Sequence, residues 1–115
     1  MLIDKTFKKI QKQIEKNIIL LYMKGSPKLP MCGFSFKAFQ ILQQCTKNFS
    51  YIDVLENKDI RIMLPKFSNW PTFPQLWINK KLIGGCDTIT EMFNCNELQI
   101  LIKNTLKKEN KNTIC

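Results

Sequence analysis

Cys32 and Ser35 lie three positions apart in the tetrapeptide Cys32-Gly33-Phe34-Ser35. Many sites of thiol–disulfide exchange carry two cysteines at this spacing, and those two thiols close a disulfide with each other. Here the second position holds a hydroxyl, so Cys32 has no partner within the tetrapeptide. A reaction at Cys32 therefore needs a second sulfur, from a small thiol or from another protein chain.

Cys32 follows the turn-rich segment 25–30 and precedes a predicted helix. A thiol at a helix start meets unpaired N–H groups and the positive end of the helix dipole, and Lys24 adds a nearby cation. Such surroundings lower a cysteine pKa to about 3.5–7.5 and favour the thiolate, which is both nucleophile and metal ligand. Gly33 allows another backbone to approach the sulfur, and we expect Phe34 to anchor the helix in the core. A buried structural thiol is the competing interpretation.

The remaining chemistry is limited, because the chain has five cysteines and no histidine. Without histidine, Cys–His nucleophilic pairs, Ser–His–Asp triads and Cys/His zinc sites are excluded. The irregular cysteine spacing lacks a C-x-x-C pair and indicates free thiols in a reducing compartment. We expect Cys45 and Cys95 to be packing residues and Cys115 to be an exposed thiol of the tail.

The hydrophobic pattern predicts alternating helices and strands. The predicted elements are, in order, a helix over 2–16, a strand over 18–22, a helix beginning at 32–33, a strand over 49–54, a helix over 58–67 that Pro65 shortens or kinks, strands over 75–78 and 82–83, a helix with Asp87 as its N-cap, and a last helix over 98–106. This order, with a cysteine at a strand-to-helix loop, is a thioredoxin-like α/β layout. We expect a small four-stranded mixed sheet with helices on both faces.

The length of 115 residues predicts one domain over 1–108 and a frayed polar tail over 109–115. The longest apolar run, 18–22, is far shorter than the roughly 20 residues of a membrane-spanning helix. The N-terminus has no apolar core or cleavage site typical of a signal peptide. The sequence therefore predicts a cytoplasmic protein without membrane contact.

The net charge of +9 comes almost entirely from lysine, since Arg61 is the single arginine. Lysines gather near both ends of the chain, which suits either a solvated face or a nucleic-acid surface. No aromatic residues interleave with them for base stacking, so we expect no nucleic-acid partner. Lysine together with abundant isoleucine and asparagine is also what an AT-biased coding sequence supplies.

Four motifs, taken together, resemble the monothiol glutaredoxins with a CGFS site, in their short single-domain bacterial form. The resemblance extends over residues 7–106. The motifs are Tyr22-Met23-Lys24-Gly25, Ser26-Pro27 ahead of Cys32-Gly33-Phe34-Ser35, Trp70-Pro71-Thr72-Phe73-Pro74-Gln75, and Gly84-Gly85-Cys86-Asp87. The CGFS tetrapeptide carries the reactive group of the family, and the resemblance assigns that reactive thiol to Cys32.

The resemblance implies a glutathione site. Thr72, Phe73 and Pro74 match the family's cis-proline turn, which exposes the backbone of Phe73 to the cysteine of glutathione in the manner of an added strand. Lys24 and Arg61 match the positions that hold the glycine carboxylate of glutathione. An ordinary trans proline, and a solvated Arg61, are the competing interpretations.

Gly84, Gly85, Cys86 and Asp87 match the site for the γ-glutamyl end of glutathione. Backbone N–H groups at a helix start would hold its carboxylate, and the Asp87 carboxylate would meet its ammonium group. Cys86 is expected to contribute backbone and not its thiol. Asp87 as a simple N-cap is compatible with this role.

The resemblance further implies a carrier of a 2Fe–2S cluster. Such clusters usually take four thiolates, which Cys32 from each subunit of a homodimer and two glutathione sulfurs would supply. The apo form would be a monomer, a BolA-like protein could replace one subunit, and the cluster would pass to acceptor apoproteins. The alternative is a monothiol enzyme in which Cys32 reduces glutathionylated proteins. Family members are mostly poor at this reaction, so the sequence leaves open whether the chain is an enzyme.

Overall fold

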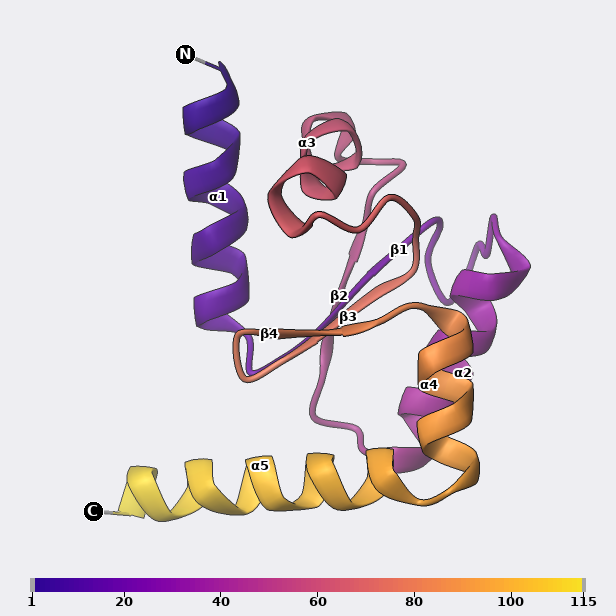
Figure 1. The fold of residues 1–115 in the computed structure, drawn as a ribbon, viewed down its shortest axis with the longest axis vertical. Coiled ribbons are helices and arrows are strands. Elements are labelled where there is room, and N and C mark those ends of the chain that lie inside the picture. Colours follow the sequence, from indigo (N-terminus) through magenta and orange to yellow (C-terminus); the bar gives the residue numbers. More distant parts are fainter. Residues whose placement is uncertain (1, 115) are drawn as a thin grey trace.

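The computed structural model describes the backbone of residues 2–114 and the side chains of residues 3–109. Over this range the chain forms five helices and four strands, shown in Figure 1. They are α1 Leu2–Lys16, β1 Ile19–Met23, α2 Gly33–Cys45, β2 Ser50–Asp53, α3 Lys58–Ser68, β3 Gln75–Ile78, β4 Lys81–Gly84, α4 Cys86–Asn94 and α5 Glu97–Ile114. No helix in the described part of the chain is long and apolar enough to cross a membrane.

The four strands form one mixed sheet in the order β2-β1-β3-β4. β1 and β2 run parallel, while β1–β3 and β3–β4 are antiparallel. Every residue of β1 is buried, as its unbroken apolar sequence predicts for a central strand covered on both faces. The predicted thioredoxin-like fold, with a four-stranded mixed sheet between helices, is confirmed.

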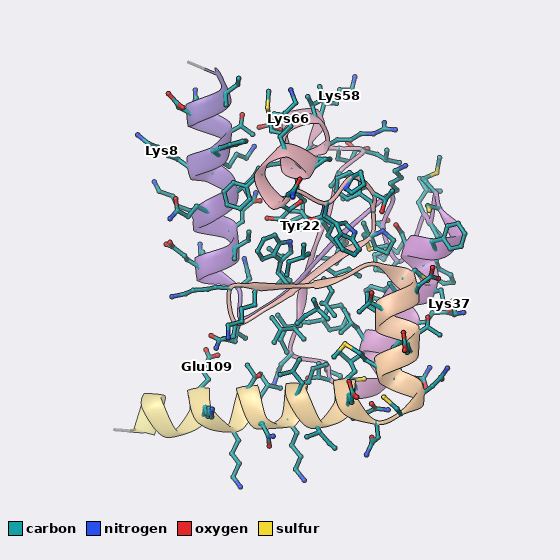
Figure 2. All side chains as sticks on the ribbon, viewed as in Figure 1. Lys8, Tyr22, Lys37, Lys58, Lys66 and Glu109 are labelled. Atoms are coloured by element: carbon teal, nitrogen blue, oxygen red, sulfur yellow. The ribbon has the colours of Figure 1, made fainter. Side chains whose placement is uncertain are left out.

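The helices divide between the two faces of the sheet, as Figures 1 and 2 show. Leu21 and Met23 of β1 face a core formed with α2, α4 and α5. Leu20 and Tyr22 face the opposite core, formed with α1 and α3. The Tyr22 hydroxyl, which lies in the interior in Figure 2, donates a hydrogen bond of 2.9 Å to Gln13 Oε1 of α1. Alternate residues of one strand therefore hold both helical layers in place.

Some element boundaries differ from the sequence-based expectations. The prediction that Asp87 is the N-cap of α4 is wrong, because Gly85 occupies that position and Asp87 lies in the first helical turn. The strand β4 ends at Gly84, so α4 begins two residues earlier than it would with Asp87 as its N-cap. Pro65 lies inside α3, which continues three residues beyond it to Ser68.

The last helix is also longer than predicted. α5 extends to Ile114, whereas the sequence predicted a frayed tail after Lys108. The segment 109–114 contains neither glycine nor proline, so nothing in it interrupts helical geometry. Cys115 lies outside the described residues.

The strand directions bring distant motifs to one edge of the sheet. β3 is antiparallel to β1, and Tyr22 near the end of β1 pairs with Gln75 at the start of β3. β4 is antiparallel to β3, so Gly84 at its end pairs with Leu76. The segments that follow β1, precede β3 and follow β4 therefore meet at this edge, and they carry the four motifs of the sequence.

Candidate functional site

Cys32 lies at this edge as the N-cap of α2, in extended backbone conformation with φ −152° and ψ 125°. Burial raises the pKa of its thiol, but the backbone N–H and hydroxyl of Ser35, the backbone N–H of Phe34 and the charge of Lys24 together hold that pKa below its ordinary value. These hydrogen-bond donors and the charge of Lys24 all favour the thiolate over the thiol. Cys32 is half-buried and therefore accessible as a nucleophile or ligand.

Ser35 occupies the position at which a C-x-x-C site has its second cysteine. Its hydroxyl forms a hydrogen bond with the backbone. The side chain is fully buried, and its Oγ accepts a hydrogen bond of 3.0 Å from the backbone N–H of Lys24. This bond ties the start of α2 to the residue that follows β1. The hydroxyl therefore fixes Lys24 beside Cys32.

Asp53 supports the same segment from the neighbouring strand. Its Oδ1 accepts hydrogen bonds of 2.9 Å from the backbone N–H groups of Gly25 and Leu55. Together with the Ser35 contact, this anchors the two consecutive residues Lys24 and Gly25. Asp53 was not among the predicted site residues, although a lone carboxylate at the end of a predicted strand is a signal for such a role.

The loop before Cys32 is a compact turn built on Gly25. This glycine has φ 96°, and a Cβ there would lie 2.5 Å from Met31 N and 2.6 Å from Leu29 O. Ser26 and Leu29 exchange two backbone hydrogen bonds of 3.1 and 3.2 Å, which close the turn. The turn presents Leu29 and Met31 to solvent, with 68% and 60% of their surface exposed.

Phe34 corrects a second expectation, since 66% of its surface is exposed and it does not anchor α2 in the core. Phe34 lies in the first turn of α2, which begins beyond the end of β1, where the sheet offers no surface to cover it. Ser35 and Ala38 take the buried side of the helix instead. A Cβ built at Gly33, beside Cys32, would have no described atom within 4 Å apart from its chain neighbours and the backbone of its own helix, so the space there is open.

A pocket of about 290 Å³ joins the three motifs that meet near Cys32. The peptide bond Phe73–Pro74 in its wall is cis, which confirms that expectation. The pocket is lined by Phe34, Trp70, Thr72, Phe73, Pro74, Gly85, Cys86, Asp87 and Thr88. Of the residues predicted to contact glutathione, Phe73, Cys86 and Asp87 thus share one pocket, whereas Lys24 and Arg61 are not part of its lining.

Gln75 holds the wall of this pocket in shape and was missed as a site residue. It is fully buried, and its Nε2 donates hydrogen bonds to Trp70 O at 2.9 Å and to Ser68 Oγ at 3.1 Å. Its Oε1 accepts a bond of 3.3 Å from Trp77 Nε1. A glutamine opening an otherwise apolar strand is the signal that identifies it. Gly85 lies close to the same wall, since a Cβ there would be 3.3 Å from Pro74 O.

The other described cysteines lie in different settings. Cys45, Cys86 and Cys95 are free thiols like Cys32. The prediction that Cys95 is a packing residue is wrong, because it follows the end of α4 and is exposed. Burial raises the pKa of Cys45, the last residue of α2, which packs against the core. Cys86 lines the pocket, and its Sγ lies 4.0 Å from Thr90 Oγ1. Over the described residues, no group of three or more His, Cys, Asp or Glu side chains is arranged to hold a metal ion.

Comparison with known proteins agrees with this geometry. The family model described as glutaredoxin matches residues 19–83. The chain is 60% identical over 103 residues to Glutaredoxin 4 of Escherichia coli strain K12, covering 90% of each protein. It is 59% identical to Glutaredoxin 4 of Haemophilus ducreyi, covering 90% of this chain and 96% of that one.

Solved structures show the same fold. The solution structure of reduced poplar apo GrxS14 superposes with a TM-score of 0.78 at 34% identity, covering 92% of this chain and 98% of that chain. The half-buried thiol at the start of α2, the cis-proline turn and the Gly84–Asp87 segment are arranged on this shared framework. The fold, the site and the sequence relationships together establish that the chain belongs to the glutaredoxin family.

Proposed function

We propose that the chain binds a 2Fe–2S cluster together with glutathione and delivers it to acceptor apoproteins. The observation that carries the proposal is the isolated Cys32 thiol, with a lowered pKa and with a buried hydroxyl, Ser35, where a second thiol would be. A thiolate is the usual ligand of such clusters, which take four. Cys32 provides one ligand per chain, glutathione provides another, and two copies of each complete the set.

The pocket lined by Phe34, two residues after Cys32, supports glutathione as the second ligand. The backbone of Phe73, next to cis-Pro74, is at the pocket wall and offers an N–H and a C=O to an extended peptide. Gly85 is the N-cap of α4, which begins at Cys86, and the N–H groups at this helix start suit a carboxylate. Asp87 is exposed there and would meet an ammonium group. Lys24 lies close enough to Cys32 to lower its pKa and would attract the other carboxylate. Arg61 is exposed on α3, where it would add a second cation for that carboxylate.

The surface around Cys32 suits contact with a second subunit. Space is open at Gly33, and the side chains of Leu29, Met31 and Phe34 are exposed. They lie on Cys32's own helix start and on the turn before it, so a second subunit could approach the sulfur without a steric barrier. The cluster-bridged form would be a homodimer and the apo form a monomer. A BolA-like protein is the expected alternative to the second subunit.

The decisive experiment is anaerobic reconstitution with iron, sulfide and glutathione, followed by visible absorption spectra and sedimentation analysis. We expect a coloured dimer that returns to a colourless monomer when glutathione is removed. Cys32→Ser should remain colourless, whereas Cys95→Ser, which removes an exposed thiol of the far end of α4, should bind the cluster as the native chain does. A coloured Cys32→Ser variant would contradict the proposal.

A second candidate function, reduction of glutathionylated proteins, is favoured by the same lowered pKa of Cys32. The Cys32 thiolate would attack the glutathione sulfur of a mixed disulfide and release the protein thiolate. A second glutathione thiolate would then attack the Cys32–glutathione disulfide, giving oxidised glutathione and free Cys32. Rapid turnover of a glutathionylated peptide by a colourless monomer would assign this function in place of cluster transfer.

A further inference from the structure

Five lysines form a continuous band on α1, which we name the lysine stripe: Lys5, Lys8, Lys9, Lys12 and Lys16. At 3.6 residues per turn they fall within an arc of about 100° and extend over roughly 17 Å of the helix. The stripe lies opposite Ile10 and Ile14, which are buried against the sheet. The acidic residues of α1, Asp4 and Glu15, fall just outside this arc, and neither forms an ion pair with a lysine of the stripe in the described part of the chain.

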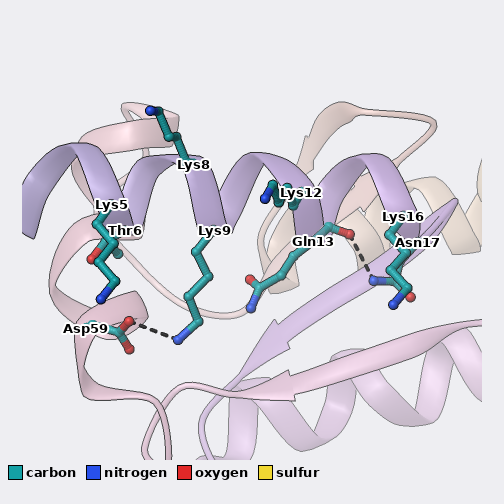
Figure 3. A pocket seen from close by; sticks show the side chains of 9 residues that line it. All are labelled: Lys5, Thr6, Lys8, Lys9, Lys12, Gln13, Lys16, Asn17 and Asp59. Atoms are coloured by element: carbon teal, nitrogen blue, oxygen red, sulfur yellow. Dashed lines mark hydrogen bonds and ion pairs between the residues drawn. The ribbon is translucent and has the colours of Figure 1, made fainter.

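The lysine stripe borders a groove of about 1020 Å³, shown in Figure 3. Its other lining residues are Thr6, Gln13 and Asn17 of α1 and Asp59 of α3. Figure 3 shows Lys9 reaching Asp59, an ion pair of 2.9 Å, while Lys8 points away from that carboxylate. Among the described residues, the other four lysines of the stripe form no ion pair.

The four lysines without an ion pair favour an anionic partner. The residues that line the groove indicate which kind of anion fits it. The groove has neither arginine nor aromatic side chains in its lining. It therefore lacks the guanidinium forks that bind phosphates and bases bidentately and the rings on which bases stack. Lysines at intervals of three and four residues along one helix face match carboxylates repeated at the same intervals on another helix.

We propose that the lysine stripe docks an acidic helix of a partner protein, one whose glutamates or aspartates repeat along a single face. Thr6 is buried, and Gln13 and Asn17 already form hydrogen bonds within the chain, Gln13 Oε1 with the Tyr22 hydroxyl and Asn17 Nδ2 with Gln13 O. The lysines therefore supply the contacts to the docked helix. α1 and α2 lie on opposite sides of the molecule in Figure 1, so the docked helix leaves Cys32 accessible. The inference stands independently of the cluster-carrier proposal.

The test uses a fluorescein-labelled helical peptide with six glutamates on one face, and a peptide of identical composition with the glutamates distributed around the helix. Fluorescence anisotropy measures the affinity of each. We expect the one-face peptide to bind more tightly than its isomer, with an affinity that falls steeply as salt rises from low to physiological concentration.

Two quadruple variants of equal net charge locate the contact. Replacing Lys5, Lys8, Lys12 and Lys16 by glutamine should weaken binding at least about tenfold, while the Lys9–Asp59 ion pair is retained. The matched control replaces four exposed lysines elsewhere, Lys47, Lys103, Lys107 and Lys108, and should change the affinity less than about twofold. Equal losses in both variants would show that only net charge matters and would overturn the proposal.

Further measurements address folding and other anions. Amide chemical-shift changes in the native chain should map to α1 and the start of α3, and this result requires no variant. The alkylation rate of Cys32 should be unchanged by saturating peptide. Tighter stripe-dependent binding of a short duplex DNA, or of phosphatidylserine vesicles, than of the one-face peptide would assign the surface to nucleic acid or to membrane and overturn the acidic-helix proposal. Absence of peptide binding would overturn it as well.

Discussion

The two ends of α2 carry the same residue in opposite surroundings. Cys32 caps the N-terminus, where N–H groups and Lys24 outweigh the effect of burial and lower the thiol pKa. Cys45 is the last residue of the helix, where burial raises the thiol pKa. The helix dipole acts in the same sense, because its positive end faces Cys32 and its negative end faces Cys45.

The difference shows that the reactivity of a thiol here depends on its position along the helix and not on the residue type. The N-terminal end is held by polar contacts, chiefly the bond from Lys24 N–H to Ser35 Oγ. The C-terminal end is held by apolar packing, where Ile41, Leu42 and Cys45 join the core of α4 and α5. One end is therefore arranged for chemistry and the other for stability.

The largest expected effect is in thiol reactivity. Iodoacetamide at pH 7 should alkylate Cys32 at least about tenfold faster than Cys45, because only the thiolate reacts and Cys45 is also shielded by the core. Peptide mapping by mass spectrometry at timed quenching measures both rates in the native chain. Cys32→Ser should leave the slow rate of Cys45 unchanged. Equal rates at the two cysteines would remove the basis of the comparison.

The next largest effect is expected at the apolar, C-terminal end of α2. Leu42→Ala should lower the free energy of unfolding by about 2–5 kcal/mol, because Leu42 is fully buried in the core beside Cys45. Urea unfolding followed by circular dichroism provides the measurement. The control Ile62→Ala, at an exposed position of α3, should stay within about 0.5 kcal/mol of the native chain. The alkylation rate of Cys32 should not change in either variant, and a slower rate in Leu42→Ala would show that the two ends are coupled.

A smaller effect is expected at the polar, N-terminal end of α2. Ser35→Ala should lower the free energy of unfolding by about 1–3 kcal/mol, since the N–H of Lys24 loses its acceptor. It should also raise the pKa of Cys32, because the Ser35 hydroxyl helps to lower it. The pH dependence of Cys32 alkylation should therefore move to higher pH. Ser50→Ala, at an exposed position of β2, is the matched control and should change neither quantity; an unshifted alkylation profile in Ser35→Ala would contradict the assigned role.

The smallest effect is in the pH dependence of stability, where the two thiols act with opposite sign. The lowered pKa of Cys32 stabilises the fold above the unfolded-state pKa of about 8.5, and this contribution disappears as the pH falls through the folded pKa. The raised pKa of Cys45 gives a contribution that is present below the unfolded-state pKa and is lost as the pH rises through the folded pKa.

Unfolding curves in reductant between pH 6 and pH 9.5 test this difference. The stability deficit of Cys32→Ser relative to the native chain should grow as the pH rises toward about 8.5. The deficit of Cys45→Ser should shrink above that pH. Parallel pH profiles for the two variants would mean that the two ends of α2 do not differ in the way described.

Much of the fold was predictable because each element carries a local signal. The alternation of Ile10 and Ile14 with lysines marks α1, and the apolar run that forms β1 marks a strand buried on both faces. Asn79 and Lys80 both have positive φ, as a tight turn between β3 and β4 requires. The placement of Asp87 was predicted wrongly because a capping residue and a first-turn acid look alike in sequence.

Most residues of the site were predictable from the sequence. The residues that hold the site in shape through hydrogen bonds were not predicted. Cys32 and cis-Pro74 were identified from their motifs, and Phe34 was misplaced because its hydrophobic side chain lies where no strand covers it. Asp53 and Gln75 were missed, since each acts through hydrogen bonds that form only in the folded chain. Asp53 accepts one from Gly25, 28 residues away in sequence, and Gln75 donates one to Trp70 O across the cis-proline turn.

The sequence by itself determined the elements, the single thiol at position 32 and the hydroxyl at position 35, because these depend on residue type and short-range spacing. The tertiary structure decided where the thiol lies relative to the cis-proline turn and the Gly84–Asp87 segment. That meeting depends on β3 running antiparallel to β1, and β4 to β3, so that three chain-distant loops share one sheet edge. Strand direction arises from packing over the whole domain, and for that reason it is not contained in any one motif.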